Sequence, residues 1–303
     1  MLKHRLIAGS VMAAGVLAIL VGDALLSHAL GFTFVPFLCV LTIVAAWFTT
    51  RELVGIIPEP NRPPLELCVA GVVGLFVTHF VQAVVGSLPG WERFGPRSWE
   101  PVAAVFALFV LAAFLFEMYR YRASGDSVTK IAHAVLVAAY LGVLPSFFVK
   151  LRWLIPDADH PHVPALYLAL AVFVPKCQDI GAFFVGRFLG RTKFTPLLSP
   201  KKTWEGFAGG FLGSTFAACF LHGFGLLSGV GPAFRYGWIE AIAFGVVVGF
   251  VGVLGDLAES LVKRDGQIKD ASQTVPGFGG LLDVIDSILF AAPVAYLWFA
   301  VQN

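Results

Sequence analysis

Long apolar runs separated by short polar connectors make up most of the chain. Each run has about 20 residues or more, the length that an α-helix needs to cross the hydrocarbon core of a bilayer. The runs lie near 6–29, 33–56, 66–88, 100–119, 128–149, 163–187, 206–228, 236–260 and 281–301. This pattern predicts an all-α protein, a polytopic integral membrane helical bundle with about nine transmembrane helices.

The composition agrees with a membrane bundle. Of the 303 residues, 58% are hydrophobic and only 13% are charged, whereas a soluble domain has about 25% charged residues. The mean hydropathy is +0.82. The net charge of +2 is too small to imply a nucleic-acid partner, so the partner that the composition predicts is the lipid bilayer. The four cysteines are scattered through apolar runs and show neither zinc-ligand nor disulfide spacing.

Lysine and arginine residues are distributed unevenly among the predicted loops. With a cytoplasmic N-terminus, 15 of the 21 lie on the cytoplasmic side, 5 lie on the opposite side and Lys176 lies within a helix. Because short loops rich in lysine and arginine stay in the cytoplasm, we expect the N-terminus inside and the C-terminus outside. The compact chain shows no transit peptide, which suggests a bacterial host and the cell inner (cytoplasmic) membrane.

The character of the chain changes about half-way along it. Residues 1–160 are mostly apolar helix, and we expect them to form a scaffold that faces lipid. From Lys176 onward, polar residues occur at membrane depth and the cytoplasmic loops become basic. Residues 161–303 are therefore the predicted catalytic region, with its motifs on the cytoplasmic side. In the first half Asp23 is an exception, and we expect it to meet a polar group inside the bundle.

Ionisable residues gather in four segments of the second half, 176–191, 193–206, 255–270 and 276–287. A charged residue inside a membrane costs about 2.5–3.5 kcal/mol on insertion scales, so it marks either a function or a buried pair. Residues three or four apart share a helix face. Two sets of residues have this spacing and should each share one helix face. The first is Asp256, Glu259, Ser260 and Lys263, and the second is Asp283, Asp286 and Ser287. The predicted orientation places all four segments at the cytoplasmic side.

Carboxylates next to basic residues at a membrane surface are typical of a site for Mg²⁺ and phosphate. Mg²⁺ prefers oxygen ligands, takes one or two protein carboxylates and completes its shell with water and substrate phosphate. Lysines and arginines of the neighbouring loops would bind the remaining phosphate oxygens. The turn 276–280 is rich in glycine and precedes a helix N-terminus, where unpaired N–H groups favour anions.

Each of these groups also has an alternative interpretation. The aspartates of the last segment could pair with Lys263 or Arg264 and simply join two helices. The carboxylates of 255–270 could form a proton or ion relay, as in a transporter. The Lys201-Lys202 pair could be a positive anchor at the level of the lipid headgroups.

The spacing of these residues resembles a known signature. Ser260-Leu-Val-Lys263-Arg264, then Lys269-Asp270, then Pro276-Gly277-x-Gly279-Gly280-x-x-Asp283-x-x-Asp286-Ser287 is similar to the C-terminal signature of the phosphatidate cytidylyltransferases, also called CDP-diacylglycerol synthases. The segment SPKKTWEG (199–206) and the Asp179 segment also resemble inner motifs of that family. The match covers roughly residues 176–290. It departs from the family at two positions, where Phe278 replaces the usual His and Val284 the usual Arg.

The resemblance implies transfer of a cytidylyl group from CTP to phosphatidic acid, which gives CDP-diacylglycerol and pyrophosphate. The attacking phosphate is already ionised at neutral pH, so the reaction needs charge neutralisation more than it needs a base. We therefore expect the chain to be active despite Phe278 and Val284.

The resemblance also implies a role for each candidate residue. Asp256 and Asp283 would be the Mg²⁺ ligands, and a second cation is left open. Asp286 would complete or orient the site, and Lys263 would neutralise phosphate charge. The residues expected to bind substrate are Asp179, Ser199, Lys201, Lys202, Thr203, Arg264 and Lys269.

Three competing hypotheses remain. A CTP-dependent lipid-alcohol kinase would transfer the γ-phosphoryl group instead and would need a base for its hydroxyl nucleophile. An ion-coupled transporter would show internal repeats and broken helices at the midplane. A non-catalytic scaffold would be supported only by Phe278 and Val284. The sequence leaves a homodimer open.

Overall fold

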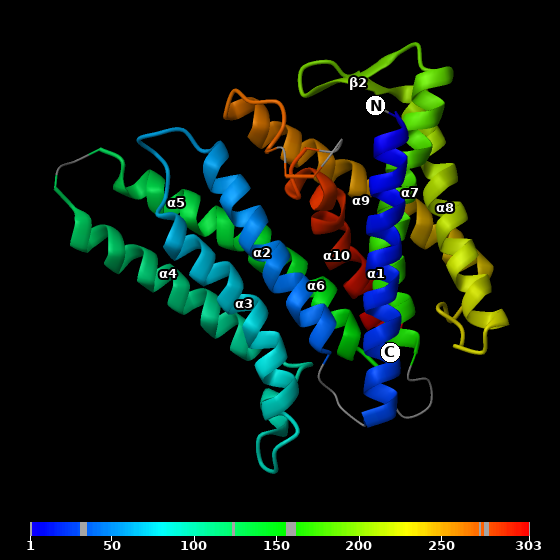
Figure 1. The fold of residues 1–303 in the computed structure, drawn as a ribbon, viewed down its shortest axis with the longest axis horizontal. Helices are drawn as coiled ribbons and strands as arrows, with labels where there is room; N and C mark the ends of the chain where they lie inside the picture. Colours follow the sequence, from blue (N-terminus) through cyan, green and yellow to red (C-terminus); the bar gives the residue numbers. More distant parts are fainter. Residues whose placement is uncertain are drawn as a thin grey trace. The chain divides into compact units, whose positions relative to one another are not determined.

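The computed structural model describes residues 2–30, 35–122, 125–155, 162–272, 274–275 and 279–302, without the side chains of 2–8 and 28–30. Within this described part, nine helical spans are long and apolar enough to cross a membrane. They confirm the all-α membrane bundle that the apolar runs predict (Figure 1).

The chain forms two compact units. The first contains Met1–Ser146 and Gly266–Val284, and the second contains Phe147–Asp265 and Ile285–Asn303. The segment 266–284, which carries Lys269 and Asp283, thus belongs to the same unit as the N-terminal helices. The division by role at residue 160 stays a prediction.

The first unit is built from the N-terminal helices. They are α1 (Leu2–Leu30), α2 (Pro36–Ile56), α3 (Leu65–Val85), α4 (Glu100–Arg120) and α5 (Ser127–Ala138), with a short 3₁₀ turn, η1 (Glu92–Phe94). In Figure 1, α2, α3, α4 and α5 run side by side. Gly71 on α3 makes one of these contacts close, because a Cβ there would lie 2.2 Å from the ring of Phe109 on α4.

The predicted span at 128–149 is one helix with changes of winding along it. After α5 the backbone forms a π-helical turn, η2 (Ala139–Val143), then α6 (Leu144–Lys150) and a final 3₁₀ turn, η3 (Leu151–Trp153). The span as a whole runs from Ser127 to Trp153.

Asp23 on α1 meets polar groups, as expected. Its carboxylate accepts hydrogen bonds from the backbone N–H groups of Phe37, at 3.0 Å, and Leu38, at 2.6 Å. These N–H groups belong to the first turn of α2, where they have no partner within the helix and where the helix dipole favours a negative charge. The buried Asp23 therefore fixes the start of α2.

The second unit contains α7 (Val163–Phe188), α8 (Trp204–Leu227), α9 (Trp238–Asp265) and most of α10 (Leu282–Gln302). The segment between α7 and α8, predicted as a loop, forms an antiparallel hairpin of β1 (Lys193–Thr195) and β2 (Ser199–Thr203). Thr203 then begins α8, because its hydroxyl accepts a hydrogen bond from the N–H of Gly206, as at many helix N-termini.

Glycines bring α7 and α8 into backbone contact. Gly206, Gly209, Gly210 and Gly213 follow the spacing that places residues on one face of α8. A Cβ at Gly206 would lie 2.8 Å from the carbonyl oxygen of Ala182, and one at Gly213 would lie 2.3 Å from that of Cys177. Small residues at such spacing are typical of close helix pairs in membranes.

A second set of glycines lets α10 approach α9. A Cβ at Gly255 would lie 2.5 Å from the carbonyl oxygen of Asp286, and one at Gly252 would lie 2.9 Å from Pro175 on α7. Near the opposite end of α10, the rings of Phe244 and Phe299 pack with their centroids 5.1 Å apart. This close packing brings polar residues of α7, α9 and α10 together.

Candidate functional site

Lys176 lies at the centre of the polar residues in the second unit. Its Nζ lies 3.1 Å from Oδ2 of Asp179 and 3.1 Å from Oδ1 of Asp286. Ser287 donates a hydrogen bond to Asp179 at 3.2 Å, which ties α10 to α7 a second time. The buried Asp286 therefore pairs with a lysine of α7, and not with Lys263 or Arg264 as the joining interpretation supposed.

Three carboxylates come together beside this lysine. Asp256, Glu259 and Asp286 each offer an oxygen, and these oxygens lie within 4.8 Å of one another. Asp256 and Glu259 share a face of α9, as their spacing predicts, and Asp286 reaches them because Gly255 admits α10. Hard carboxylate oxygens at such separations are the kind of ligands that Mg²⁺ takes.

Lysines balance most of the negative charge of this cluster. Lys202, on β2, lies 2.8 Å from Asp256, and Lys263 lies 2.6 Å from Glu259, one helical turn away. With Lys176, three lysines face the four carboxylates of Asp179, Asp256, Glu259 and Asp286. Counted with Asp179, the carboxylates outnumber these three lysines by one, so a bound cation would help this region to attract a triphosphate.

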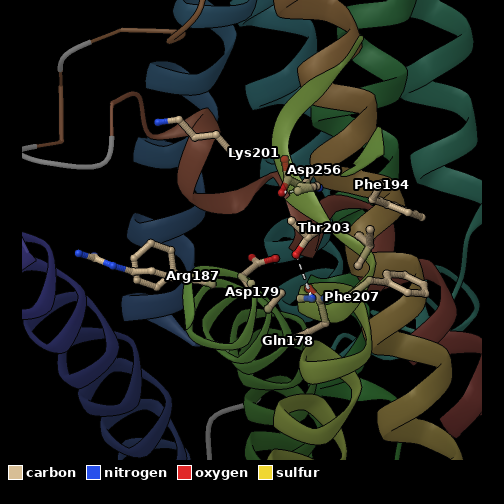
Figure 2. Close-up of a pocket in the computed structure, with 14 residues that line it drawn as sticks. Gln178, Asp179, Arg187, Phe194, Lys201, Thr203, Phe207 and Asp256 are labelled. Carbon is tan, nitrogen blue, oxygen red and sulfur yellow. Dashed lines mark hydrogen bonds and ion pairs between the residues drawn. The ribbon is translucent and has the colours of Figure 1, made fainter. Parts of the chain in front are cut away.

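A pocket of about 380 Å³ opens next to the cluster, between the hairpin and helices α7, α8 and α9. Asp179 and Asp256 line it, and Figure 2 shows the Asp179 carboxylate pointing inward, toward the side where Thr203 and Asp256 lie. The stacked rings of Phe194 and Phe207, with centroids 4.9 Å apart, form an apolar part of its wall.

The basic residues of the hairpin region differ in their placement. Lys202 points toward Asp256, whereas Lys201 and Arg187 extend away from the carboxylates in Figure 2. Arg264, at the end of α9, donates from Nε to the carbonyl oxygen of Leu198 at 3.3 Å, so it holds the turn of the hairpin.

The two predicted hydroxyl contacts lie on β2. Ser199 lies opposite Thr195 in the hairpin. Thr203 is buried and caps the N-terminus of α8. Glu205, which we did not single out from the sequence, accepts hydrogen bonds from the N–H groups of Arg191 and Thr192. These contacts give the hairpin a defined position against α8. The phosphate contacts of Ser199 and Thr203 stay predictions.

Asp283 and Lys269 belong to the first unit. The Asp283 carboxylate accepts hydrogen bonds from the N–H groups of Gly280, at 2.6 Å, and Ala271, at 3.2 Å. Lys269 is exposed in the segment that follows α9. The N–H groups of Leu281 and Leu282 donate to Glu52, so in the described part of this turn protein carboxylates hold the N–H groups that we expected to meet phosphate.

The two departures from the family signature are placed differently. Phe278, with Pro276 and Gly277, lies outside the described residues. Val284 is half-buried in the first turn of α10, and its N–H donates to the carbonyl oxygen of Leu281.

Comparison with known proteins gives consistent matches. A model of the cytidylyltransferase family matches residues 3–302. A phosphatidate cytidylyltransferase of Haemophilus influenzae is 30% identical over 309 residues, which cover 99% of this chain and 100% of that relative. One of Mycobacterium bovis is 31% identical over 87% of this chain and 81% of that relative. One of Synechocystis is 35% identical over 56% of this chain, and the match covers 62% of that relative, which is less than two thirds of it.

Proposed function

The chain belongs to the cytidylyltransferase family, and we propose from this premise that it transfers a cytidylyl group from CTP to phosphatidic acid. The products are CDP-diacylglycerol and pyrophosphate, so the protein acts in phospholipid biosynthesis as a phosphatidate cytidylyltransferase. The observation that carries the proposal is the cluster of Asp256, Glu259 and Asp286 beside a pocket that basic residues also line.

The reaction joins two polyanions. A phosphate oxygen of phosphatidic acid forms a bond to the α-phosphorus of CTP, and the bond from that phosphorus to the bridging oxygen breaks. Pyrophosphate leaves with the electron pair of the broken bond. The attacking oxygen is already ionised at neutral pH, so the main requirements are positioning and neutralisation of charge.

The basic side chains of this chain supply part of that neutralisation. Lys201 and Lys202 line the pocket and bring positive charge to it from β2. Lys263 lies one turn from Glu259 on α9, on the side of the carboxylate cluster. Arg264 and Lys269 are the further phosphate contacts that we propose, and Asp179 borders the pocket as a contact to the nucleotide.

The donor chemistry of the carboxylate cluster fits Mg²⁺. Asp256, Glu259 and Asp286 would hold the ion. Asp283, which belongs to the first unit, stays a ligand that only the resemblance implies. When bound, Mg²⁺ would neutralise charge on the phosphate oxygens during transfer. Lys176 would keep Asp179 and Asp286 in place, since it contacts both carboxylates.

The protein is a multi-pass membrane protein. We propose the inner membrane of a bacterial cell as its location, with the N-terminus in the cytoplasm and the C-terminus outside. This orientation places Arg191, Lys202, Lys263 and Lys269 on the cytoplasmic side, where CTP is made. The lipid substrate would reach the site from the bilayer.

The test is a product assay with purified protein in detergent, CTP, phosphatidic acid and Mg²⁺. We expect CDP-diacylglycerol and pyrophosphate from the parent, and a loss of at least 100-fold, roughly the effect of one essential electrostatic group, in Asp256→Asn. Asp126→Asn is the matched control, because Asp126 is a partly exposed carboxylate that pairs with Lys130 outside the cluster. Formation of CDP and a phosphorylated lipid from a lipid alcohol would instead identify the kinase. An inactive, folded parent would contradict the proposal.

A further inference from the structure

Glu52, on α2, contacts the segment that precedes α10 through four hydrogen bonds. Its Oε1 accepts from the hydroxyls of Ser272, at 2.6 Å, and Thr274, at 3.0 Å. The backbone N–H of Leu281 donates to the same oxygen at 3.0 Å, and that of Leu282 donates to Oε2 at 2.7 Å. All these residues belong to the first unit, although Glu52 is more than 200 residues away in the sequence.

The fit between α2 and this segment is also steric. A Cβ at Gly280 would lie 2.7 Å from Oε2 of Glu52, so a larger residue there would require the carboxylate to shift from its hydrogen bonds. One turn further along α2, Ile56 packs against Gly266, where a Cβ would lie 2.5 Å from its Cγ2. Residues four apart share a helix face, so one strip of α2 contacts both the beginning and the end of the segment 266–282.

The charge of Glu52 suits its position. The first N–H groups of a helix have no partner within the helix, and the positive end of the helix dipole favours an anion there. Glu52 supplies that anion at the start of α10, and it is only 7% exposed. Hydrogen bonds to an ionised acceptor are about twice as strong as neutral ones, so these contacts hold the four donor residues firmly against α2.

Asp283 depends on the same segment. It lies directly after Leu282, and it accepts hydrogen bonds from Gly280 and Ala271. Glu52 thus holds Ser272 and Leu281, which directly follow the two residues, Ala271 and Gly280, that donate to Asp283. Asp286 follows one turn later on α10. A shift at the start of α10 would therefore move both Asp283 and Asp286.

We propose that Glu52 is a positioning residue for the reaction, which orients Asp283 and the start of α10 through Ser272, Leu281 and Leu282. The inference rests on the proposed function, and it gives a role in the reaction to a residue from the half of the chain that we expected to be scaffold. Glu52 touches neither CTP nor lipid in this proposal. A misplacement of about 1 Å can cost about 100-fold in rate, so its effect on turnover can be large.

The experiment compares Glu52→Gln with Glu240→Gln in the full-length protein. Glu240 is a matched control because it is equally buried and also holds α10, by accepting hydrogen bonds from Trp298, at 3.0 Å, and Gln302. For each protein we would measure kcat and KM for CTP, the Mg²⁺ dependence, the thermal midpoint in detergent and the hydrogen exchange of residues 279–284.

We expect Glu52→Gln to lower kcat by about 10- to 100-fold and to speed exchange at 279–284, while exchange in the other helices stays as in the parent. Glu240→Gln should keep kcat within about threefold of the parent, well below the loss expected from misplacing a reacting group. Unchanged exchange at 279–284 in Glu52→Gln would overturn the inference whatever the parent makes. Faster exchange with unchanged kcat would limit Glu52 to a structural role and would overturn the inference as well.

A second variant covers the case in which Glu52→Gln unfolds. Ser272→Ala combined with Thr274→Ala removes two of the four donors and leaves the carboxylate in place. We expect a smaller loss of kcat, about three- to tenfold, with faster exchange at 279–284. Parent-like kcat and exchange in this variant would overturn the inference. If the parent made no CDP-lipid, the proposed function would fail, and the exchange data would still decide whether Glu52 orders this segment.

Discussion

Lys176 on α7 and Asp286 on α10 form an ion pair, with Nζ 3.1 Å from Oδ1, although 110 residues separate them in the sequence. The same lysine contacts Asp179, so one cation joins the two aspartates inside the bundle. A carboxylate at membrane depth is costly without a partner, and this lysine makes both carboxylates tolerable there. It also fixes Asp286 next to Asp256 and Glu259.

Replacing Lys176 should therefore damage both stability and activity. In Lys176→Met, two aspartates would lose their shared cation. Because Lys176 and Asp179 are partly exposed, we expect a cost of about 1–3 kcal/mol, below that of a fully buried pair. We expect a lower thermal midpoint in detergent and a loss of CDP-lipid formation. Lys201→Met is the control for stability, because Lys201 is exposed. A thermal midpoint equal to that of the parent would show that the ion pair contributes little to the fold.

Gly255 is expected to tolerate no side chain. Its Cβ would lie 2.5 Å from the carbonyl oxygen of Asp286, so Gly255→Ala must push α10 away from α9. Overpacking of this kind typically costs about 1–3 kcal/mol, and here it would also separate Asp286 from Asp256. Thermal unfolding and turnover would both be measured. Gly15→Ala on α1 is the control, since a Cβ there would meet no atom within 4 Å from the described residues beyond its own helix backbone and chain neighbours. Equal behaviour of the two variants would contradict this interpretation of the helix contact.

Much of the fold could be predicted from the length and polarity of the apolar runs. The helix 36–56, for example, follows from a run that is long enough to span and from Pro36 at its start. The hairpin 193–203 was predicted as a loop because its strands are short and mostly polar. The glycine face of α8 was present in the spacing of Gly206, Gly210 and Gly213, and a search for small residues at helical spacing would have found it.

The site could be predicted in part. The spacing of Asp256 and Glu259 placed them on one face of α9, and the structure adds Asp286 to them. Neither the pairing of Lys176 with Asp286 nor the contacts of Glu52 could be predicted, because both join residues far apart in the sequence. Glu52 did carry a signal, since Glu52 and its neighbour Arg51 are the two charged residues of the predicted span 33–56.

The orientation of the chain can be tested with fusions. Because lysine and arginine favour cytoplasmic loops, alkaline phosphatase fused after residue 303 should be active outside the cytoplasm. The same reporter inserted after Lys201 should be inactive, since that loop is proposed to lie inside. The opposite pattern would invert the orientation and place the basic hairpin away from cytoplasmic CTP.

The carboxylate cluster should set the Mg²⁺ requirement. Asp256→Asn and Glu259→Gln each replace a charged ligand by a neutral one, so we expect the Mg²⁺ concentration for half-maximal activity to rise about tenfold or more. Asp283→Asn separates the structural role of Asp283 from its proposed role as a ligand. The amide oxygen can still accept a hydrogen bond from Gly280, whereas the negative charge is lost. If Asp283 is a ligand, its variant should shift the Mg²⁺ dependence as the other two do. Activity titrations with Mg²⁺ would measure this, with Asp126→Asn as the control. A Mg²⁺ dependence equal to that of the parent in Asp256→Asn and Glu259→Gln would mean that these carboxylates do not hold the ion.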